Sequence, residues 1–349
     1  MSARSAQLLT LFKGALLAVA LTVAAPGVSV EAAPAAKKTT SKAAASKKAA
    51  PKKAAAKRPS TAAKKKTVAS KTKKPSAVKK TASLATGIAA ASLPPALSSG
   101  GTPDRLDLGS TVAFVQDLGS SDVLFAKNEA AVLPIASITK LMTALVVVDA
   151  EQDLDEQLEI TRDDIDYLKN TRSRLVVGTR LTRREMLHLA LMSSENRAAN
   201  ALGRHYPGGL TAFVQAMNAK AKLLGMFETG FVEPTGLDSS NVSSPRDLVQ
   251  LMKVASSRPL IRGFTTDTEY QVLVNGKVER FRNTNYLVSK PEWNISVSKT
   301  GFIREAGRCL VMLAQIDGRE LAIVLLDSTG TLTRTADAVR IRKWLESTV

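Results

Sequence analysis

The chain has 349 residues, of which 44% are hydrophobic and 23% are charged, and its formal net charge is +18. The single cysteine excludes an internal disulfide, and two histidines are too few for a histidine-based catalytic triad to be assumed. Length alone predicts two domains, but the composition is uneven along the chain. The predicted organisation is a signal peptide at 1–32, a tail at 33–100 and a catalytic domain at 101–349.

The first 32 residues have the pattern of a secretory signal. Arg4 and Lys13 precede an apolar stretch from Gly14 to Ala25, and small residues follow up to a predicted cleavage after Ala32. The alternative is an anchor that is not cleaved. Either form predicts a secreted, periplasmic or envelope-associated protein.

Residues 37–80, here called the basic tract, contain 17 lysines and arginines and no acidic or aromatic residue. Such a segment cannot bury enough apolar surface to order itself, so disorder is expected. The tract contributes +17 and residues 1–36 contribute +1, which leaves residues 81–349 neutral. The tract resembles linker-histone tails, but export argues against a nucleic-acid partner and favours an anionic wall or lipid surface. A solvated spacer is the alternative.

The first half of the catalytic domain predicts a hairpin followed by helices. Two short β-type runs after Gly109 are separated by Gly-Ser-Ser, which is typical of a hairpin. A helix is expected from Ser137 to about Ala150. The stretch RREMLHLALMSSENRAANALGRH predicts two helices that meet at SSEN, and Ser244 and Pro245 have the pattern of a helix start.

The second half predicts mainly strands. EYQVLV and KVERF flank Asn275 and Gly276, which favour a type I′ hairpin turn. ISVSKTG, GRCLVMLAQI and RELAIVLLD read as consecutive antiparallel strands, with DGR as the last turn. A final helix places the following apolar residues roughly on one face: Ala336, Val339, Ile341, Trp344 and Leu345. The predicted fold class is α+β, with one antiparallel sheet flanked by helices and a helical subdomain inserted between its strands.

Ser137 and Lys140 form the first candidate catalytic pair. Ser-x-x-Lys occurs four times in the chain, but only Ser137 opens a predicted helix, on which positions i and i+3 lie about 5 to 6 Å apart. Lys140 must be neutral to accept a proton, and lowering its pKa to about 7 costs about 4 to 5 kcal/mol. Burial and a second cation, for which Lys299 is available, are the expected means.

Two further motifs are candidates for the same site as Ser137 and Lys140. Ser194 and Asn196 lie in the predicted break between helices, and Lys299, Thr300 and Gly301 are expected at the end of a strand. Each motif is weak alone, because a helix cap would explain the first and a solvated lysine would explain the second. Their order and context together favour a single site.

With these motifs the sequence resembles the low-molecular-mass penicillin-binding proteins of the D-Ala-D-Ala peptidase family, which combine Ser-x-x-Lys, Ser-x-Asn and Lys-Thr-Gly. PIASITKLMTALV, MSSENRAANAL, FVEPTGLD and KTGFIREAGRCLVMLA resemble the family's stretches, and the likeness covers nearly all of residues 105–349. Among subgroups the chain looks closest to the penicillin-binding protein 7 type DD-endopeptidases. The resemblance implies a DD-peptidase/β-lactamase-like fold.

The resemblance also implies a role for each motif residue. Ser137 would be the acyl-enzyme nucleophile and Lys140 its base, while Ser194 and Asn196 would relay a proton and contact the substrate amide. Lys299 and Thr300 would bind the carboxyl side of the substrate, beside Gly301, and the backbone amides of Ser137 and Phe302 would form the oxyanion hole. The expected partners are peptidoglycan stem peptides and β-lactams, with no cofactor and no metal.

Several alternatives stay open at this stage. A DD-carboxypeptidase is one, although the 48 residues after Gly301 leave no room for the additional β-domain of many carboxypeptidases. A β-lactamase is disfavoured because no Glu-x-x-Leu-Asn-type stretch lies between Asn196 and Lys299. The alternative from another class is a non-catalytic wall-binding protein.

Four other features have simpler predicted roles. The PTGLD stretch at 234–238 is expected to be a turn that shapes the site, and Cys309 a buried apolar residue. His188 is expected to be structural. Arg334 would either meet a substrate carboxylate or lie in solvent at a helix start.

Overall fold

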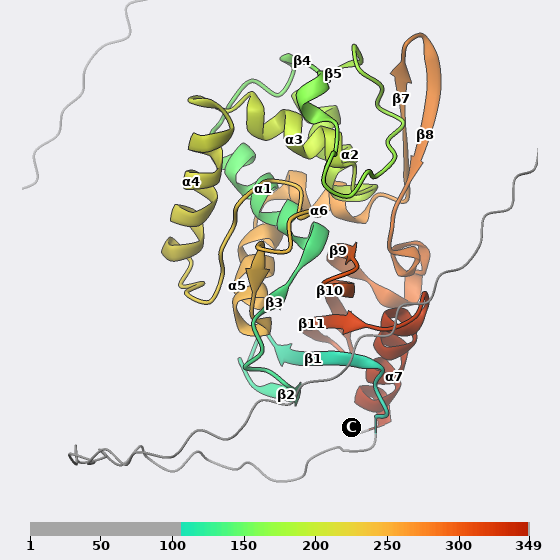
Figure 1. Ribbon diagram of the computed structural model, residues 1–349. Helices are drawn as coiled ribbons and strands as arrows, with labels where there is room; N and C mark the ends of the chain where they lie inside the picture. Colours follow the sequence, from blue (N-terminus) through green and yellow to red (C-terminus); the bar gives the residue numbers. More distant parts are fainter. Residues whose placement is uncertain (1–105, 348–349) are drawn as a thin grey trace, which may run out of the picture. The chain divides into compact units, whose positions relative to one another are not determined.

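Five antiparallel strands form the main sheet of residues 106–347, the part of the chain that the computed structural model describes (Figure 1). Their order in the sheet is β2-β1-β11-β10-β9, so the first and the last strand in sequence are neighbours near its middle. The strands are β1 (Ser110–Asp117), β2 (Val123–Lys127), β9 (Ile295–Ile303), β10 (Gly307–Ile316) and β11 (Arg319–Ser328). All of them pair antiparallel, as the sequence predicted.

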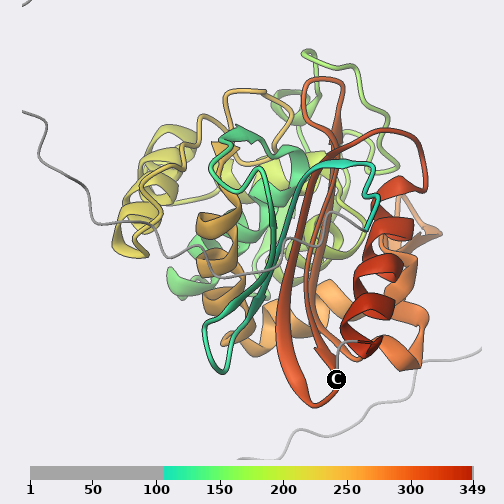
Figure 2. The same ribbon diagram turned by 90° about the horizontal axis from the view of Figure 1, so that it is seen from below.

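Helices cover both faces of this sheet (Figure 2). On β10, Leu310, Met312 and Ala314 pack towards α7 (Thr333–Ser347), while the alternate side chains join the core of the helical side. Side chains of a strand alternate between its two faces. Burial on both faces therefore explains why β10 and β11 read as nearly continuous apolar runs.

The other helices lie between β2 and β9 in sequence and form the predicted insertion. They are α1 (Thr139–Asp149), α2 (Arg183–Met192), α3 (Asn196–Arg204), α4 (Gly209–Leu223), α5 (Pro245–Ser256) and α6 (Pro259–Thr266). Short 3-10 turns are η1 (Ala136–Ile138), η2 (Arg162–Asp164), η3 (Tyr286–Ser289) and η4 (Pro291–Trp293). Small antiparallel pairs are β3 (Leu133–Pro134) with β6 (Val242–Ser243), β4 (Gln157–Glu159) with β5 (Arg180–Thr182), and β7 (Glu269–Val274) with β8 (Lys277–Arg282).

Local sequence signals explain most of these boundaries. Ser244 caps α5 by accepting a hydrogen bond from the amide of Asp247, with Pro245 in the first helical position. Asn275 and Gly276 both have positive φ, as a type I′ turn requires. Both predictions are confirmed.

Other predictions need correction. The α-helix expected from Ser137 begins at Thr139, and Ser137 lies in the preceding 3-10 turn. The predicted apolar face of α7 differs at one position: Ile341 and Leu345 are buried, but the buried alanine is Ala338, whereas Ala336 is only partly buried. α4 and α6 were not predicted.

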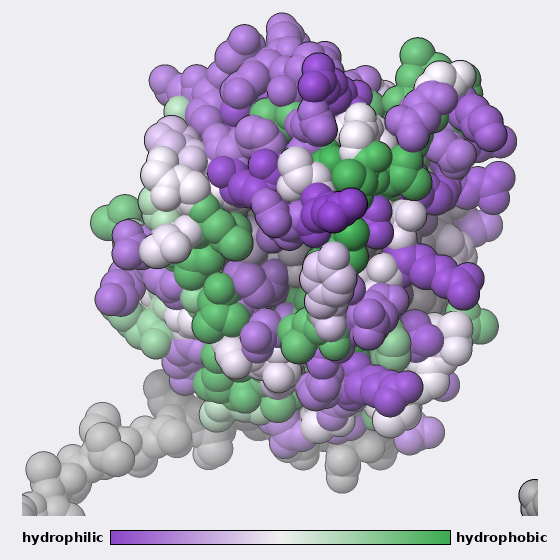
Figure 3. Space-filling model, turned by 45° about the horizontal axis from the view of Figure 1, so that its top comes forward, coloured by the Kyte–Doolittle hydropathy of each residue, from purple (hydrophilic) through white to green (hydrophobic). Residues whose placement is uncertain are grey.

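Residues 1–105 lie outside the described part, and with them the predicted signal peptide and basic tract. Within residues 106–347, no helix combines the length and the apolar character that a membrane crossing requires. Hydrophilic residues predominate over the upper part of the face in Figure 3, and apolar residues form smaller clusters there.

Candidate active site

Ser137 lies half-buried in η1, a turn that two glycines hold in place. The preceding residue, Ala136, has a left-handed φ of 48°. A Cβ on Gly236 would lie 1.9 Å from the carbonyl oxygen of Ala136, and one on Gly301 would lie 2.8 Å from that of Ile135. Neither distance is possible, so both positions need glycine. On Gly301, the side where a Cβ would stand therefore faces the turn that presents Ser137.

Lys140 lies one turn further on, in α1, and its side chain is fully buried. Its Nζ is 2.9 Å from Oγ of Ser137, 2.7 Å from Oδ1 of Asn196 and 2.6 Å from the backbone oxygen of Thr235. The two carbonyl oxygens can only accept hydrogen bonds. A neutral amine therefore donates its two protons to them and directs its lone pair at the Ser137 hydroxyl, which is the arrangement of a general base.

Burial lowers the pKa of Lys140 to about 7, while the charges of Glu233 and Glu195 act in the opposite direction. A substantial fraction of the amine is therefore neutral at physiological pH. Lys299 is the second cation that the sequence predicted near Lys140, and its own pKa falls well below the ordinary value, through burial and then through the charge of Lys140. Because repulsion between two ammonium groups is mutual, a protonated Lys299 also disfavours protonation of Lys140. Burial is the main cause for both amines.

Ser194 and Asn196 lie where α2 gives way to α3. Ser194 has a left-handed φ of 64°, and its Oγ accepts a hydrogen bond of 2.9 Å from Nζ of Lys299. The helix-cap interpretation is wrong, because the N-cap of α3 is Glu195 and no side chain caps that end. The break instead aims Ser194 at Lys299 and Asn196 at Lys140.

Lys299, Thr300 and Gly301 lie inside β9, which continues to Ile303, so the predicted strand end is wrong. Lys299 is 1% exposed, which excludes a solvated lysine. Thr300 is nearly buried and donates to Oγ1 of Thr284 at 2.7 Å. Strand geometry thus brings Lys299 beside Ser194, and Gly301 beside the turn of Ser137.

A hollow of about 260 Å³ lies above this cluster. Its lining residues are Ser137, Ser194, Asn196, Thr284, Thr300, Gly301, Phe302 and Arg334. The ring of Phe302 is half-exposed at the rim, with the guanidinium of Arg308 at 4.6 Å from its centre. Arg334 is half-buried and donates to the backbone oxygens of Gly301 and Cys309, so its predicted solvent position is wrong.

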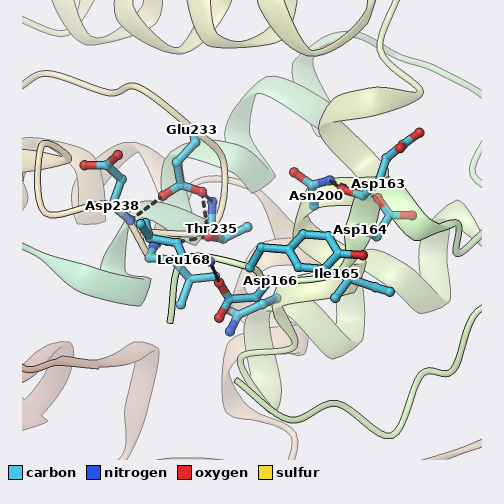
Figure 4. A pocket seen from close by; sticks show the side chains of 12 residues that line it. Asp163, Asp164, Ile165, Asp166, Leu168, Asn200, Glu233, Thr235 and Asp238 are labelled. Carbon is cyan, nitrogen blue, oxygen red and sulfur yellow. Dashed lines mark hydrogen bonds between the residues drawn. The ribbon is translucent and has the colours of Figure 1, made fainter. Parts of the chain in front are cut away.

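A second recess of about 190 Å³ shares Asn196 with the first hollow (Figure 4). Asp166 comes from the loop before β5, and Glu233 and Thr235 come from the segment after α4. The carboxylate of Glu233 accepts hydrogen bonds from the backbone amides of Thr235 and Gly236, which fixes the predicted PTGLD turn. This turn presents the Thr235 carbonyl to Lys140.

Sequence reasoning missed four groups that complete the site. These are the backbone oxygen of Thr235 and the side chains of Thr171, Glu233 and Thr284. The FVEPTGLD stretch was a signal for Glu233 and Thr235, whereas no local pattern marks Thr171 or Thr284. Two simpler predictions agree with the structure: Cys309 is buried, and His188 is buried between the rings of Phe264 and Tyr270.

Several known proteins are similar to this chain. A Pseudomonas aeruginosa protein named D-alanyl-D-alanine endopeptidase is 47% identical over 267 residues, which cover 76% of this chain and 85% of that protein. An Escherichia coli K12 protein of the same name is 46% identical over 248 residues, covering 70% and 80%. The crystal structure of the Streptomyces K15 DD-transpeptidase superposes with a TM-score of 0.63 at 28% identity, over 68% of this chain and 97% of that one.

These likenesses agree with the fold class and the family inferred from the sequence. Residues 100–330, more than half of the chain, match the family described as D-alanyl-D-alanine carboxypeptidase. The predicted family resemblance is therefore confirmed, and the chain belongs to the D-alanyl-D-alanine carboxypeptidase family.

Proposed function

We propose that this protein is a serine DD-peptidase of peptidoglycan and that it cuts the D-alanyl cross-links between stem peptides as an endopeptidase. The observation that supports it most is the 2.9 Å contact between Nζ of a fully buried Lys140 and Oγ of Ser137. The names of the P. aeruginosa and E. coli relatives support the choice of cross-links as substrate.

In this mechanism Ser137 is the nucleophile and Lys140 the base. Neutral Lys140 accepts the hydroxyl proton while Oγ attacks the D-alanyl carbonyl carbon, and the proton then passes to the departing amine. A water molecule hydrolyses the resulting ester and restores Ser137. The backbone amides of Ser137 and Phe302 are proposed to stabilise the oxyanion, because preorganised amides stabilise charge that develops in the transition state.

The other motif residues are proposed to hold the substrate. Asn196 contacts the substrate amide, and Ser194 relays a proton with Lys299, to which it is hydrogen-bonded. Lys299 and Thr300 are proposed to bind the carboxyl side of the scissile bond. Thr300 lines the same hollow as Ser137, and the buried Lys299 is hydrogen-bonded to Ser194, which also lines it. Penicillin is expected to acylate Ser137 as a substrate analogue.

A soluble cross-linked stem-peptide dimer tests the endopeptidase assignment. We expect the purified protein to convert the dimer to two monomers faster than it releases free D-alanine from a monomeric pentapeptide, with both products quantified by mass spectrometry. Preincubation with penicillin should block both reactions. Faster release of D-alanine would instead support the carboxypeptidase alternative, which the description of the family favours. No turnover of either substrate would leave the wall-binding alternative.

For the basic tract we propose an electrostatic tether to an anionic wall polymer or lipid, outside the cytoplasm and downstream of a signal peptide. Its support is the charge of the sequence: residues 37–80 contain 17 cations and no acid, whereas residues 81–349 are neutral. Such attraction weakens as salt shortens the screening length.

Deletion of residues 33–82 tests the tether. Turnover of the soluble dimer should be unchanged, because every proposed catalytic group lies beyond the deletion. Binding to sacculi or anionic vesicles should fall in a sedimentation assay, and the full-length protein should lose the same advantage between about 50 and 500 mM salt. Equal binding by both proteins at low salt would reduce the tract to a spacer.

A further inference from the structure

The loop between η2 and β5 contacts the proposed active site from outside, through Thr171. Oγ1 of Thr171 accepts a hydrogen bond of 3.0 Å from Nδ2 of Asn196. The same hydroxyl donates to Oδ2 of Asp166 at 2.7 Å. A series of hydrogen bonds thus runs from Asp166 through Thr171 and Asn196 to Lys140, and Asp166 and Thr171 lie outside the three sequence motifs.

Several hydrogen bonds hold the carboxylate of Asp166 in a fixed position. This carboxylate also accepts hydrogen bonds from the backbone amides of Leu168, Lys169 and Thr171, at 2.8 to 2.9 Å. Figure 4 shows the one from Leu168. Burial acts to raise the pKa of Asp166, but these hydrogen bonds outweigh it and hold the pKa below its ordinary value. The carboxylate is therefore ionised at neutral pH and can only accept.

The ionised carboxylate of Asp166 determines which group donates in each of these hydrogen bonds. A hydroxyl has a single proton, and Thr171 gives it to Asp166, so towards Asn196 the hydroxyl can only accept. The amide nitrogen of Asn196 must then face Thr171, and the amide oxygen must face Lys140, where it lies 2.7 Å from Nζ. A reversed amide would set a nitrogen donor against the amine and an oxygen against a hydroxyl without a proton.

We propose that Asp166 and Thr171 are positioning residues that fix the side-chain amide of Asn196 and thereby aim the lone pair of Lys140 at Ser137. This inference rests on the proposed function. Oδ1 of Asn196 and the Thr235 carbonyl accept the two protons of the neutral amine. The lone pair of Lys140 therefore points at the Ser137 hydroxyl. Rotation of the amide would free a proton of Lys140 to point at Ser137 and turn the lone pair away.

Replacement of Thr171 by valine tests the inference, because valine keeps the shape and removes the hydroxyl. Thr171 is exposed and Asn196 half-buried, so water competes for the amide and the expected loss is moderate. The acylation rate constant with labelled penicillin should fall about fivefold, as expected for one net hydrogen bond. Thr171→Ser, the matched control, keeps the hydroxyl and should stay within about twofold of wild type on the same grounds.

The pH profile of acylation adds a readout that loop disorder alone would not give. An amide that no longer presents its oxygen stabilises protonated Lys140 less, so the pKa of Lys140 should fall and the acid limb of the profile should move to lower pH in Thr171→Val. The other charged groups around this amine, Glu233, Glu195 and Lys299, are the same in both proteins.

The Asn196→Ala background separates this mechanism from any other effect of the loop. If Thr171 acts through the Asn196 amide, Thr171→Val should have no further effect on acylation in that background, since coupled residues are not additive. An equal rate for Thr171→Val and wild type, or the same fivefold loss with and without Asn196, would overturn the inference. Wild-type protein that penicillin does not acylate at all would instead refute the proposed function.

Discussion

Ser137→Ala should abolish covalent labelling by penicillin and hydrolysis of the stem-peptide dimer while the fold is retained. The proposed ester forms on Oγ of Ser137, and among residues 106–347 no other hydroxyl is hydrogen-bonded to Lys140. Removing the nucleophile of a serine hydrolase typically costs on the order of 10⁴ to 10⁶-fold in rate. Labelling should be measured by gel fluorescence with a fluorescent penicillin, and folding by thermal melting.

Ser296→Ala is the matched control, since Ser296 also stands three residues before a lysine. It lies on β9, where residues three apart face opposite sides of the sheet, and its hydroxyl contacts Glu320 instead of Lys299. Labelling of this variant should equal that of wild type. Persistent labelling of a folded Ser137→Ala protein would place the nucleophile elsewhere.

Lys140→Arg should slow acylation nearly as much as Lys140→Met, by about 10² to 10⁴-fold, the usual contribution of a general base. A guanidinium stays protonated at any pH the protein tolerates, so it cannot accept the proton of Ser137. In wild type the pKa of Lys140 is about 7, so acylation should decline as the pH falls through about 7 and the amine becomes protonated. Stopped-flow acylation with a chromogenic β-lactam measures both effects.

Lys220→Arg serves as the control, because Lys220 forms a surface ion pair with Asp149 at 2.7 Å. Its acylation rate and pH profile should match those of wild type. If Lys140→Arg acylated at a near-normal rate, another group would have to be the base. If wild type showed no acid limb near pH 7, the neutral-lysine mechanism would be wrong.

The sequence was sufficient for most of the sheet and for the motif residues, because both depend on local patterns. The apolar runs of β10 and β11 reflect burial on both faces, and the Asn275–Gly276 turn reflects two positive φ angles. Ser137 and Lys140 are one helical turn apart, so their contact could be predicted from spacing. The association of three weak motifs then predicted that Asn196 and Lys299 would join them.

The remaining groups of the site could not be predicted, because Thr171, Thr235 and Thr284 meet the motif residues only through the tertiary fold. Thr235 is 95 residues from Lys140 in sequence, and it contributes a backbone oxygen, which every residue type has. Thr171 is an ordinary polar residue in an exposed loop. Two predicted boundaries were wrong: α1 begins at Thr139 and β9 continues to Ile303. Side chains do not reveal where 3-10 geometry or strand pairing stops.

The position of β11 beside β1 has a consequence for when the site can form. Ser110 pairs with Ser328, so the strand that begins the sheet waits for a strand made about 200 residues later. At the usual pace of translation that interval lasts roughly 10 to 40 s. The turn of Ser137 rests on Gly301 of β9, and β9 enters the sheet only through β10 and β11. A nascent chain therefore holds Ser137 and Lys140 long before it has the sheet that supports them, and hydrolytic competence arrives only with the last strands.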